Sequence, residues 1–291
     1  MSYSHVVIDA NNLLNRAYFA THLTNKKGEK ISGSFSTMRM TGSILKKFKP
    51  KSAIVAWDKG KSEARIKIYP EYKAQREAKR DPKEQEMLHK NRMSCIDLFS
   101  FLPVKQVMVD GVEADDVIGY LCEKLKGTKV IVSNDQDFVQ LVGPDVHLYM
   151  PNKEKLLTVK NVDEFLGYPV KYYILWKSIV GDSSDNIKGI HGIGPVKATK
   201  LIQARLNGAK KLGITSDQQA ILDRNKYLIA IGAVLTEANI KEIRTCYRAE
   251  RVKKTVSFSV VRTKFLKMEF KTLYFQFNEW SHPFQQLVRK K

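Results

Sequence analysis

The chain has few cysteines, no paired cysteine motif and no long apolar run. Its three cysteines, Cys95, Cys122 and Cys246, lie far apart, which excludes a disulfide framework and a cysteine-based zinc site. The apolar stretch at 227–235 is far shorter than the ~20 residues that cross a bilayer. The N-terminus also lacks a basic segment followed by an apolar one, so we expect neither a membrane partner nor a secretory signal.

Acidic residues are scarce relative to basic ones. The 291 residues include 50 Lys and Arg against 30 Asp and Glu, a formal net charge of +20. This excess favours a polyanionic partner, and nucleic acid is the first candidate. Hydrophobic residues make up 43% of the chain, enough to bury a core, so wholesale disorder is excluded. The length allows one large domain or two modest ones.

Short apolar runs indicate the fold class. Runs at 5–8, 53–57, 106–109 and 129–132 are separated by helical stretches, a pattern typical of a mostly parallel α/β sheet buried on both faces. Each run ends at an acidic residue or leads to one within a few positions. Because ligands of such sheets bind at the carboxyl ends of the strands, we expect acids far apart in sequence to meet at one edge.

The few acids are concentrated at these element ends. Glu113, Asp115 and Asp116 fall within four positions where a helix is predicted to begin, which is more than helix capping needs. Carboxylates this close repel each other unless cations lie between them, and their oxygens are natural ligands of Mg²⁺ and Mn²⁺. Two such ions roughly 3.5–4 Å apart can clamp the attacking and leaving oxygens of a phosphodiester. The candidate metal ligands are Asp9, Asp58, Glu113, Asp115, Asp116, Asp135, Asp137, Asp182 and Asp185.

Each of these acids also has an ordinary structural explanation when taken alone. An Asp after a strand is often a helix cap, and Asp-rich segments such as 133–137 and 181–186 are often turns. Asp9 would also suit an aspartyl-nucleophile phosphatase, but that chemistry wants a second Asp two residues later, where this chain has Asn11. The joint occurrence of the pairs favours a metal site.

Two other segments indicate contact with phosphate. Residues 59–93 carry 11 Lys and Arg against 6 Asp and Glu, and are expected to form one or two helices projecting from the sheet. Within them, Lys73 and Arg76 would share a helical face directed at the phosphate, and Tyr72 could stack on a base. From about residue 169 the pattern is helical, interrupted by a glycine-rich turn whose backbone amides could hold a DNA phosphate. That turn comprises Gly192, Ile193 and Gly194, followed by Pro195 and Lys197.

Taken together, the motifs resemble those of a known family. Seven segments occur in family order and cover residues 5 to about 205: 7–12, 57–62, 70–73, 111–116, 133–137, 181–186 and 189–194. The chain is similar to 5′ nucleases of the flap-endonuclease superfamily, especially the bacteriophage 5′-exonuclease/ribonuclease H type. The resemblance implies a PIN-like α/β domain at 1–168 with a helical arch at about 59–93. It also implies a helix-hairpin-helix DNA-binding region with C-terminal helices at 169–291.

The resemblance also implies roles for individual residues. Lys73 and Arg76 match arch residues that meet the scissile phosphate. The turn at 192–194 matches a site that binds the DNA backbone, often with K⁺. Many relatives have Lys directly after Gly-Ile-Gly-Pro, whereas here Val196 intervenes before Lys197. The implied first metal group is Asp9, Asp58, Glu113 and Asp115, and the second is Asp116, Asp135, Asp137, Asp182 and Asp185.

The function implied is metal-dependent 5′→3′ exonuclease and flap-endonuclease cleavage, using two or more Mg²⁺ ions that Mn²⁺ could replace. Its substrates would be flap, nicked or 5′-ended DNA and RNA–DNA hybrids, as in primer removal during replication. The protein would act as a monomer, alongside replication proteins, in the cytoplasm of a bacterium or a phage-infected cell. The alternatives are a non-catalytic, structure-specific DNA-binding protein, which the full set of nine carboxylates disfavours, and a PIN-type ribonuclease, which would not explain the arch and the turn.

Overall fold

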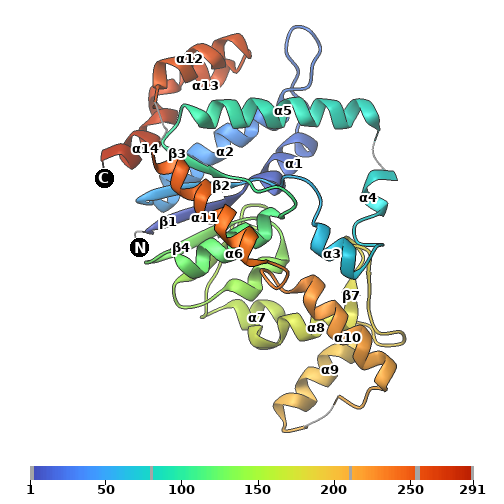
Figure 1. Ribbon diagram of the computed structural model, residues 1–291. Helices are drawn as coiled ribbons and strands as arrows, with labels where there is room; N and C mark the ends of the chain where they lie inside the picture. Colours follow the sequence, from blue (N-terminus) through green and yellow to red (C-terminus); the bar gives the residue numbers. More distant parts are fainter. Residues whose placement is uncertain (1–2, 79–80, 210–211, 253–255, 290–291) are drawn as a thin grey trace.

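The structure is a computed structural model in which residues 3–78, 81–209, 212–252 and 256–289 are described (Figure 1). At its centre lies a six-stranded sheet in the order β3-β2-β1-β4-β5-β6. The first five strands are parallel and β6 is antiparallel, which confirms the expected α/β class. The strands are β1 His5–Asp9, β2 Ser52–Ala56, β3 Val104–Val107, β4 Lys129–Val132, β5 Val146–Met150 and β6 Lys155–Leu157.

The strand order locates the ligand crevice. From β1 the chain builds β2 and β3 on one side, then crosses to β4 and β5 on the other side. Such a reversal leaves a crevice at the carboxyl ends of the two central strands. β1 and β4 end there, so Asp9 and the residues after Val132 lie at its rim.

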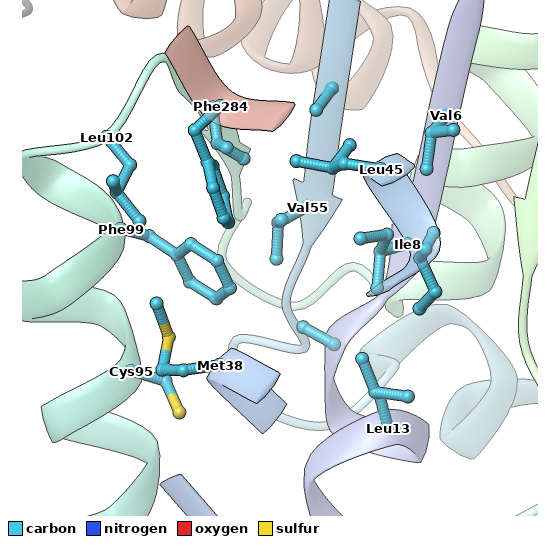
Figure 2. Close-up of a cluster of buried hydrophobic side chains, with 14 of the residues drawn as sticks. Val6, Ile8, Leu13, Met38, Leu45, Val55, Cys95, Phe99, Leu102 and Phe284 are labelled. Carbon is cyan, nitrogen blue, oxygen red and sulfur yellow. The ribbon is translucent and has the colours of Figure 1, made fainter. Parts of the chain in front are cut away.

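Both faces of the sheet are buried, as the continuous apolar runs predict. Val6, Ile8 and Val55 point to one face, where they pack with Phe99 and Phe284 (Figure 2). Alternate strand residues point to the opposite face and pack with helices α6 and α11. The helices around the sheet are α1 Ala10–Ala20, α2 Ser32–Phe48, α5 Pro82–Ser100, α6 Ala114–Lys124, α7 Val162–Leu166, α11 Glu237–Val252 and the 3-10 helix η1 Gln136–Leu141.

The segment expected to form an arch contains α3 Glu63–Ile68, α4 Gln75–Ala78 and the first part of α5. Figure 1 shows α3 and α4 standing away from the sheet before the chain returns along α5. Ser62 caps α3 by accepting a hydrogen bond from the backbone of Arg65. The helix expected from Tyr72 starts later, because Lys73 has the left-handed φ of +55° and α4 begins at Gln75.

The region after residue 169 contains a short β-hairpin between helices. Its two strands form a tight pair in which a side chain on Gly181 would lie 2.4 Å from the backbone of Gly189. Asn225, which is fully buried, donates to the carbonyl oxygens of Ser178 and Lys188 at 2.9 Å and fixes the hairpin to α10. The elements are η2 Val170–Tyr172, α8 Tyr173–Val180, β7 Gly181–Asp182, β8 Ile187–Lys188, α9 Pro195–Leu206 and α10 Ser216–Ile229.

The C-terminal helices complete the main core. Trp280 lies against Gly42 of α2, where an added Cβ would come within 2.9 Å of the indole, and its Nε1 donates to the carbonyl oxygen of Met38 at 2.9 Å. The division at 168/169 stays a prediction, and the two large hydrophobic clusters on the faces of the sheet each hold residues from both sides of it. The helices are α12 Phe258–Lys267, α13 Lys271–Phe275 and α14 Phe277–Arg289.

None of the helices in the described part of the chain is long and apolar enough to cross a membrane. This agrees with the shortness of the apolar runs in the sequence.

Trp280→Ala should lower the free energy of unfolding by about 3–5 kcal/mol, because it removes a ring that is only 7% exposed from the core. Phe275→Ala is the matched control: its ring is 80% exposed, so we expect a change within about 0.5 kcal/mol. Urea unfolding of both variants measures the difference. Equal small effects would mean that α14 is not part of the core.

Candidate active site at the edge of the sheet

Asp9 lies at the crevice, as its strand-end position predicts. It is the last residue of β1 and the N-cap of α1, and it is 5% exposed. One carboxylate oxygen accepts from the backbone N–H of Asn12 at 3.0 Å, and the other accepts from the hydroxyl of Ser133 at 2.8 Å. Ser133 follows β4 directly, so these bonds fix the carboxylate between the two central strands.

Asp58 follows β2 and joins that strand to helix α6. Its Oδ1 accepts from the backbone N–H of Ala114, the first residue of α6, at 2.7 Å. Its Oδ2 accepts from the side-chain amide of Asn11. Acidic groups are stabilised at helix N-termini, and this contact brings the acidic triplet of α6 to the ends of β1 and β2.

Asp115 and Asp135 complete a group of four acids with Asp9 and Asp58, which we call the Asp9 cluster. Burial raises the pKa of Asp9 to about 7, and the charges of Asp58 and Asp135 add to this effect. Burial, then the charges of the other three members, raises the pKa of Asp115 well above its ordinary value. Burial and the neighbouring Asp137 raise the pKa of Asp135. The charges within the cluster therefore oppose the ionisation of Asp9 and Asp115.

Within the described residues, no member of the Asp9 cluster has an ion pair with Lys or Arg, and the other five predicted acids all have one. Asp116 is 1% exposed and binds the guanidinium of Arg65 through two contacts of 2.5 and 2.9 Å. Glu113 contacts Arg65 at 3.1 Å and Lys73 at 2.6 Å. Although burial acts to raise it, the charges of Lys73 and Arg65 hold the pKa of Glu113 below its ordinary value.

Asp137 and Asp182 share a single lysine from α8. Lys177 lies between them, contacting Asp137 and reaching Asp182 at 2.7 Å. Tyr173, one turn earlier, donates to Asp137 at 2.7 Å. Burial acts to lower the pKa of Lys177, but the two carboxylates outweigh it and raise that pKa, so the side chain is a permanent cation. Asp137 thus faces Lys177, whereas its partner in the Asp-x-Asp motif, Asp135, faces the Asp9 cluster.

Asp185 lies in the turn of the β7–β8 hairpin and faces the arch. Arg76 reaches its Oδ1 at 2.5 Å, and Lys73 lies 3.6 Å from its Oδ2. The backbone N–H of Lys73 also donates to the Asp185 carbonyl oxygen at 2.9 Å, which helps to hold Lys73 in its left-handed conformation. The two predicted arch cations therefore lie among the acids, and each is bound to a carboxylate; their contact with the scissile phosphate stays a prediction.

Tyr72 differs from its expected position. Its side chain is 5% exposed and packs with Tyr69, and its hydroxyl donates to Glu113 at 2.9 Å and to Asp185 at 3.2 Å. Stacking on a base would require the ring to leave this packing. The same contacts connect the arch to the acids.

A cavity of about 670 Å³ lies between the arch, α1 and α5. Its walls include acids, cations and amides from segments far apart in sequence. It is the space in which a substrate could approach the Asp9 cluster from the arch. Among its lining residues are Asn11, Asp58, Tyr72, Lys73, Arg92 and Glu113.

The carboxylate oxygens of the acids are chemically suited to a hard divalent cation. As the side chains stand, no three His, Cys, Asp or Glu residues in the described part of the chain are arranged to hold a metal ion. The Asp9 cluster nevertheless supplies four carboxylates that have no counter-cation among the described residues, in surroundings that raise the pKa of three of them. An ion would draw these carboxylates together on binding.

The glycine-rich turn lies between the β7–β8 hairpin and α9. Gly192 has φ +79°, and a side chain at Gly192 or Gly194 would meet no atom within 4 Å, so the backbone there is open to a ligand. Gly194 is the N-cap of α9 and Pro195 its first residue. Ile193 is half-buried. Lys197 folds back, its ammonium donating to the carbonyl oxygen of Gly192 at 2.9 Å.

Sequence patterns missed Arg65 and Lys177. Arg65 is one of 11 basic residues in the arch segment, and Lys177 lies in a helix with no acidic neighbour. No local signal distinguishes them from solvated charges, because their partners are 51 and 40 residues away. Only the fold brings the pairs together.

Comparison with known proteins identifies the family. Residues 4–167 match the 5′-3′ exonuclease, N-terminal resolvase-like domain family. The 5′-3′ exonuclease of Aquifex aeolicus is 33% identical over 201 residues, 68% of this chain and 68% of that protein. That of Buchnera aphidicola (subspecies Schizaphis graminum) is 29% identical over 94% of this chain and 97% of that protein. The DNA polymerase I of Caldicellulosiruptor bescii is 34% identical, but this chain spans only 24% of its length.

Solved structures share the fold. The bacteriophage T5 flap endonuclease, solved as a complex with DNA and metal ions, has a TM-score of 0.69 at 22% identity, covering 85% of this chain and 99% of that chain. Flap endonuclease-1 from Methanococcus jannaschii has a TM-score of 0.59 at 16% identity, covering 100% of this chain and 94% of that one. The family match and the relative from Aquifex aeolicus show that this chain belongs to the 5′-3′ exonuclease family and is a phosphodiester-cleaving nuclease.

Proposed function

We propose that this nuclease is a divalent-metal-dependent, structure-specific enzyme that cleaves flap, nicked and 5′-ended DNA and also the RNA of RNA–DNA hybrids. The observation that carries the proposal is the Asp9 cluster, four carboxylates at the crevice of the sheet that have no counter-cation in the described part of the chain. A protein that only bound DNA would gain nothing from burying unneutralised acids, since acids repel phosphates.

Mg²⁺, with Mn²⁺ as a substitute, fits this cluster best. Asp9, Asp58 and Asp115 would hold the first ion together with Glu113. The remaining predicted ligands, Asp116, Asp135, Asp137, Asp182 and Asp185, would serve a second site. Asp135 would face both ions, and the other four would have to release the Lys or Arg that each binds in this structure. When bound, such ions polarise the phosphate and stabilise the charge that develops on it. Solved relatives that contain divalent metal ions support this assignment.

Lys73 and Arg76 have a role of their own in this proposal. In the structure Lys73 donates to Glu113 and Arg76 to Asp185. A phosphate that entered the cavity would present oxygens that could accept hydrogen bonds from both cations. Transfer of Lys73 from Glu113 to the phosphate would free the carboxylate for a metal and place a cation against the developing charge.

The duplex part of the substrate would lie against the glycine-rich turn. The open backbone at Gly192 and Gly194 and the amides at the start of α9 suit a phosphate, and K⁺ could share the site with the turn's carbonyl oxygens. Such contacts read no bases. The same argument supports the cleavage of hybrids, because the groups assigned here meet phosphates, which RNA and DNA share. Primer removal alongside replication proteins, by a cytoplasmic monomer, is the setting that we propose.

Metal removal tests the proposal directly. EDTA should abolish cleavage of a 5′-labelled flap, a nicked duplex and an RNA–DNA hybrid, and Mg²⁺ should restore it, because the acids need cations to act on a phosphate. Gel assays of the three substrates side by side also measure the preference among them. Undiminished cleavage in EDTA would refute the mechanism.

Two adjacent acids should respond oppositely to neutralisation. In EDTA, Asp116→Asn should lower the free energy of unfolding by about 3–5 kcal/mol, because it leaves buried Arg65 without its main partner. Asp115→Asn should leave stability unchanged or higher, because it relieves repulsion within the Asp9 cluster. With Mg²⁺, Asp115→Asn should lose most cleavage but retain DNA binding. Urea unfolding measures the stability of each variant, and gel assays measure cleavage. Equal losses of stability in the two variants would contradict these roles.

Lys73→Ala should slow cleavage of a saturating 5′-flap substrate by roughly 10²–10³-fold in single-turnover kinetics, while affinity changes little. The control is Lys67→Ala, which removes an exposed cation from α3 in the same segment. Should both variants act alike and only through affinity, Lys73 would be one more surface charge.

A further inference from the structure

Arg92 on α5 is a cation whose contacts leave most of its donors unused. Its guanidinium donates to the backbone carbonyl oxygen of Asp58 and lies over the ring of Trp57, 5.6 Å from the centroid. Its Nε is buried and has no hydrogen-bond partner. Because a guanidinium has five N–H donors, one carbonyl oxygen satisfies only a small part of its capacity.

The other cations near the acids differ from Arg92 in this respect. Arg65, Lys73, Arg76 and Lys177 each bind at least one carboxylate. No described carboxylate lies within ion-pair distance of Arg92, although it is adjacent to the acidic cluster. A half-buried guanidinium with no carboxylate partner among the described residues is suited to an anion from outside.

Arg92 faces the cavity next to the Asp9 cluster. Gln85, His89 and Arg92 line this space from one side, and their spacing of four and three residues puts them in a row on one face of α5. The row is about 10 Å long, because its ends are seven helical residues apart. Lys73 and Arg76 line the same cavity. A chain entering there would have cations on two sides.

The size of the cavity favours a single strand over a duplex. Pockets of about 300–1,000 Å³ enclose a drug-sized molecule, so a volume of about 670 Å³ has room for only about two nucleotides. Proteins that hold single strands do so with a groove of positive charge that follows the backbone.

We propose that Arg92 binds the phosphate next to the scissile one on the single-stranded 5′ end of the substrate, and that α5 guides this strand past the Asp9 cluster. The proposal rests on the proposed function, since it presumes a 5′-ended nucleic acid in this cavity. The rival explanation is structural: Arg92 would only support the end of β2 through Trp57 and the carbonyl oxygen of Asp58.

The salt dependence of binding separates these two roles. Each phosphate contact to a single strand adds about 0.7 to the slope of log affinity against log salt concentration. Arg92→Gln should therefore reduce this slope by about 0.7 on a duplex with a 5′ single-stranded flap and leave it unchanged on a blunt duplex. Affinity for the flap should fall about ten-fold or more at low salt. Arg92→Lys should retain the slope, because it keeps the charge.

Lys90→Gln is the matched control. It removes the same charge two residues away on α5, from an exposed side chain that is paired with Glu86, and should leave both slopes unchanged. All binding is measured in EDTA, so the result does not depend on cleavage. If wild-type protein fails to cleave with Mg²⁺, the proposed function fails, whereas an unchanged slope in a folded Arg92→Gln variant overturns only this inference.

A second measurement needs no variant. An uncharged methylphosphonate at the phosphate next to the cleavage position of the flap should weaken binding by the wild-type protein about ten-fold. The same replacement three phosphates further out on the flap should have a much smaller effect. Equal effects at both positions, or equal losses by Arg92→Gln on flap and blunt duplex, would show that Arg92 does not hold this phosphate.

Discussion

The repulsion among four buried carboxylates is the constraint on which the rest of the site depends. The Asp9 cluster is held at the ends of three strands and a helix by neutral donors, including the Asn12 backbone, the Ser133 hydroxyl and the Ala114 backbone. These bonds orient the acids without cancelling their charge. Burial then raises the pKa of Asp9 to about 7 and also raises the pKa of Asp115 and of Asp135. A divalent cation is best suited to relieve this repulsion.

The basic residues near the site neutralise other acids than those of the Asp9 cluster. Arg65 neutralises Asp116 within the protein, and Lys177 does the same between Asp137 and Asp182. Lys73 and Arg76 pair with acids at the arch, where a phosphate could compete for them. The site is thus divided into acids that the chain neutralises itself and acids that it leaves without a counter-cation. Nine acids of similar appearance in the sequence have different electrostatic surroundings.

Much of the fold followed from the sequence, because buried parallel strands have continuous apolar runs and their ends carry the acids. The different surroundings of Asp115 and Asp116 could not be predicted. Adjacent helical residues point about 100° apart, and which one meets Arg65 depends on where α3 packs. The packing of Trp280 on α2 could not be predicted from the sequence either, because it joins positions 242 residues apart. The left-handed Lys73 also breaks the local helical pattern, since its backbone N–H donates to the hairpin rather than to its own segment.

The most direct test of the account is the position of a bound ion. Crystals soaked with Mn²⁺ without DNA, with data collected at the manganese absorption edge, would locate it by anomalous scattering. We expect the strongest peak among the carboxylates of Asp9, Asp58, Asp115 and Asp135, with their side chains drawn together around it. A strongest peak at Asp137 and Asp182 in place of Lys177, or no peak at any of the nine acids, would contradict the claim that the fold leaves the Asp9 cluster unneutralised for a metal.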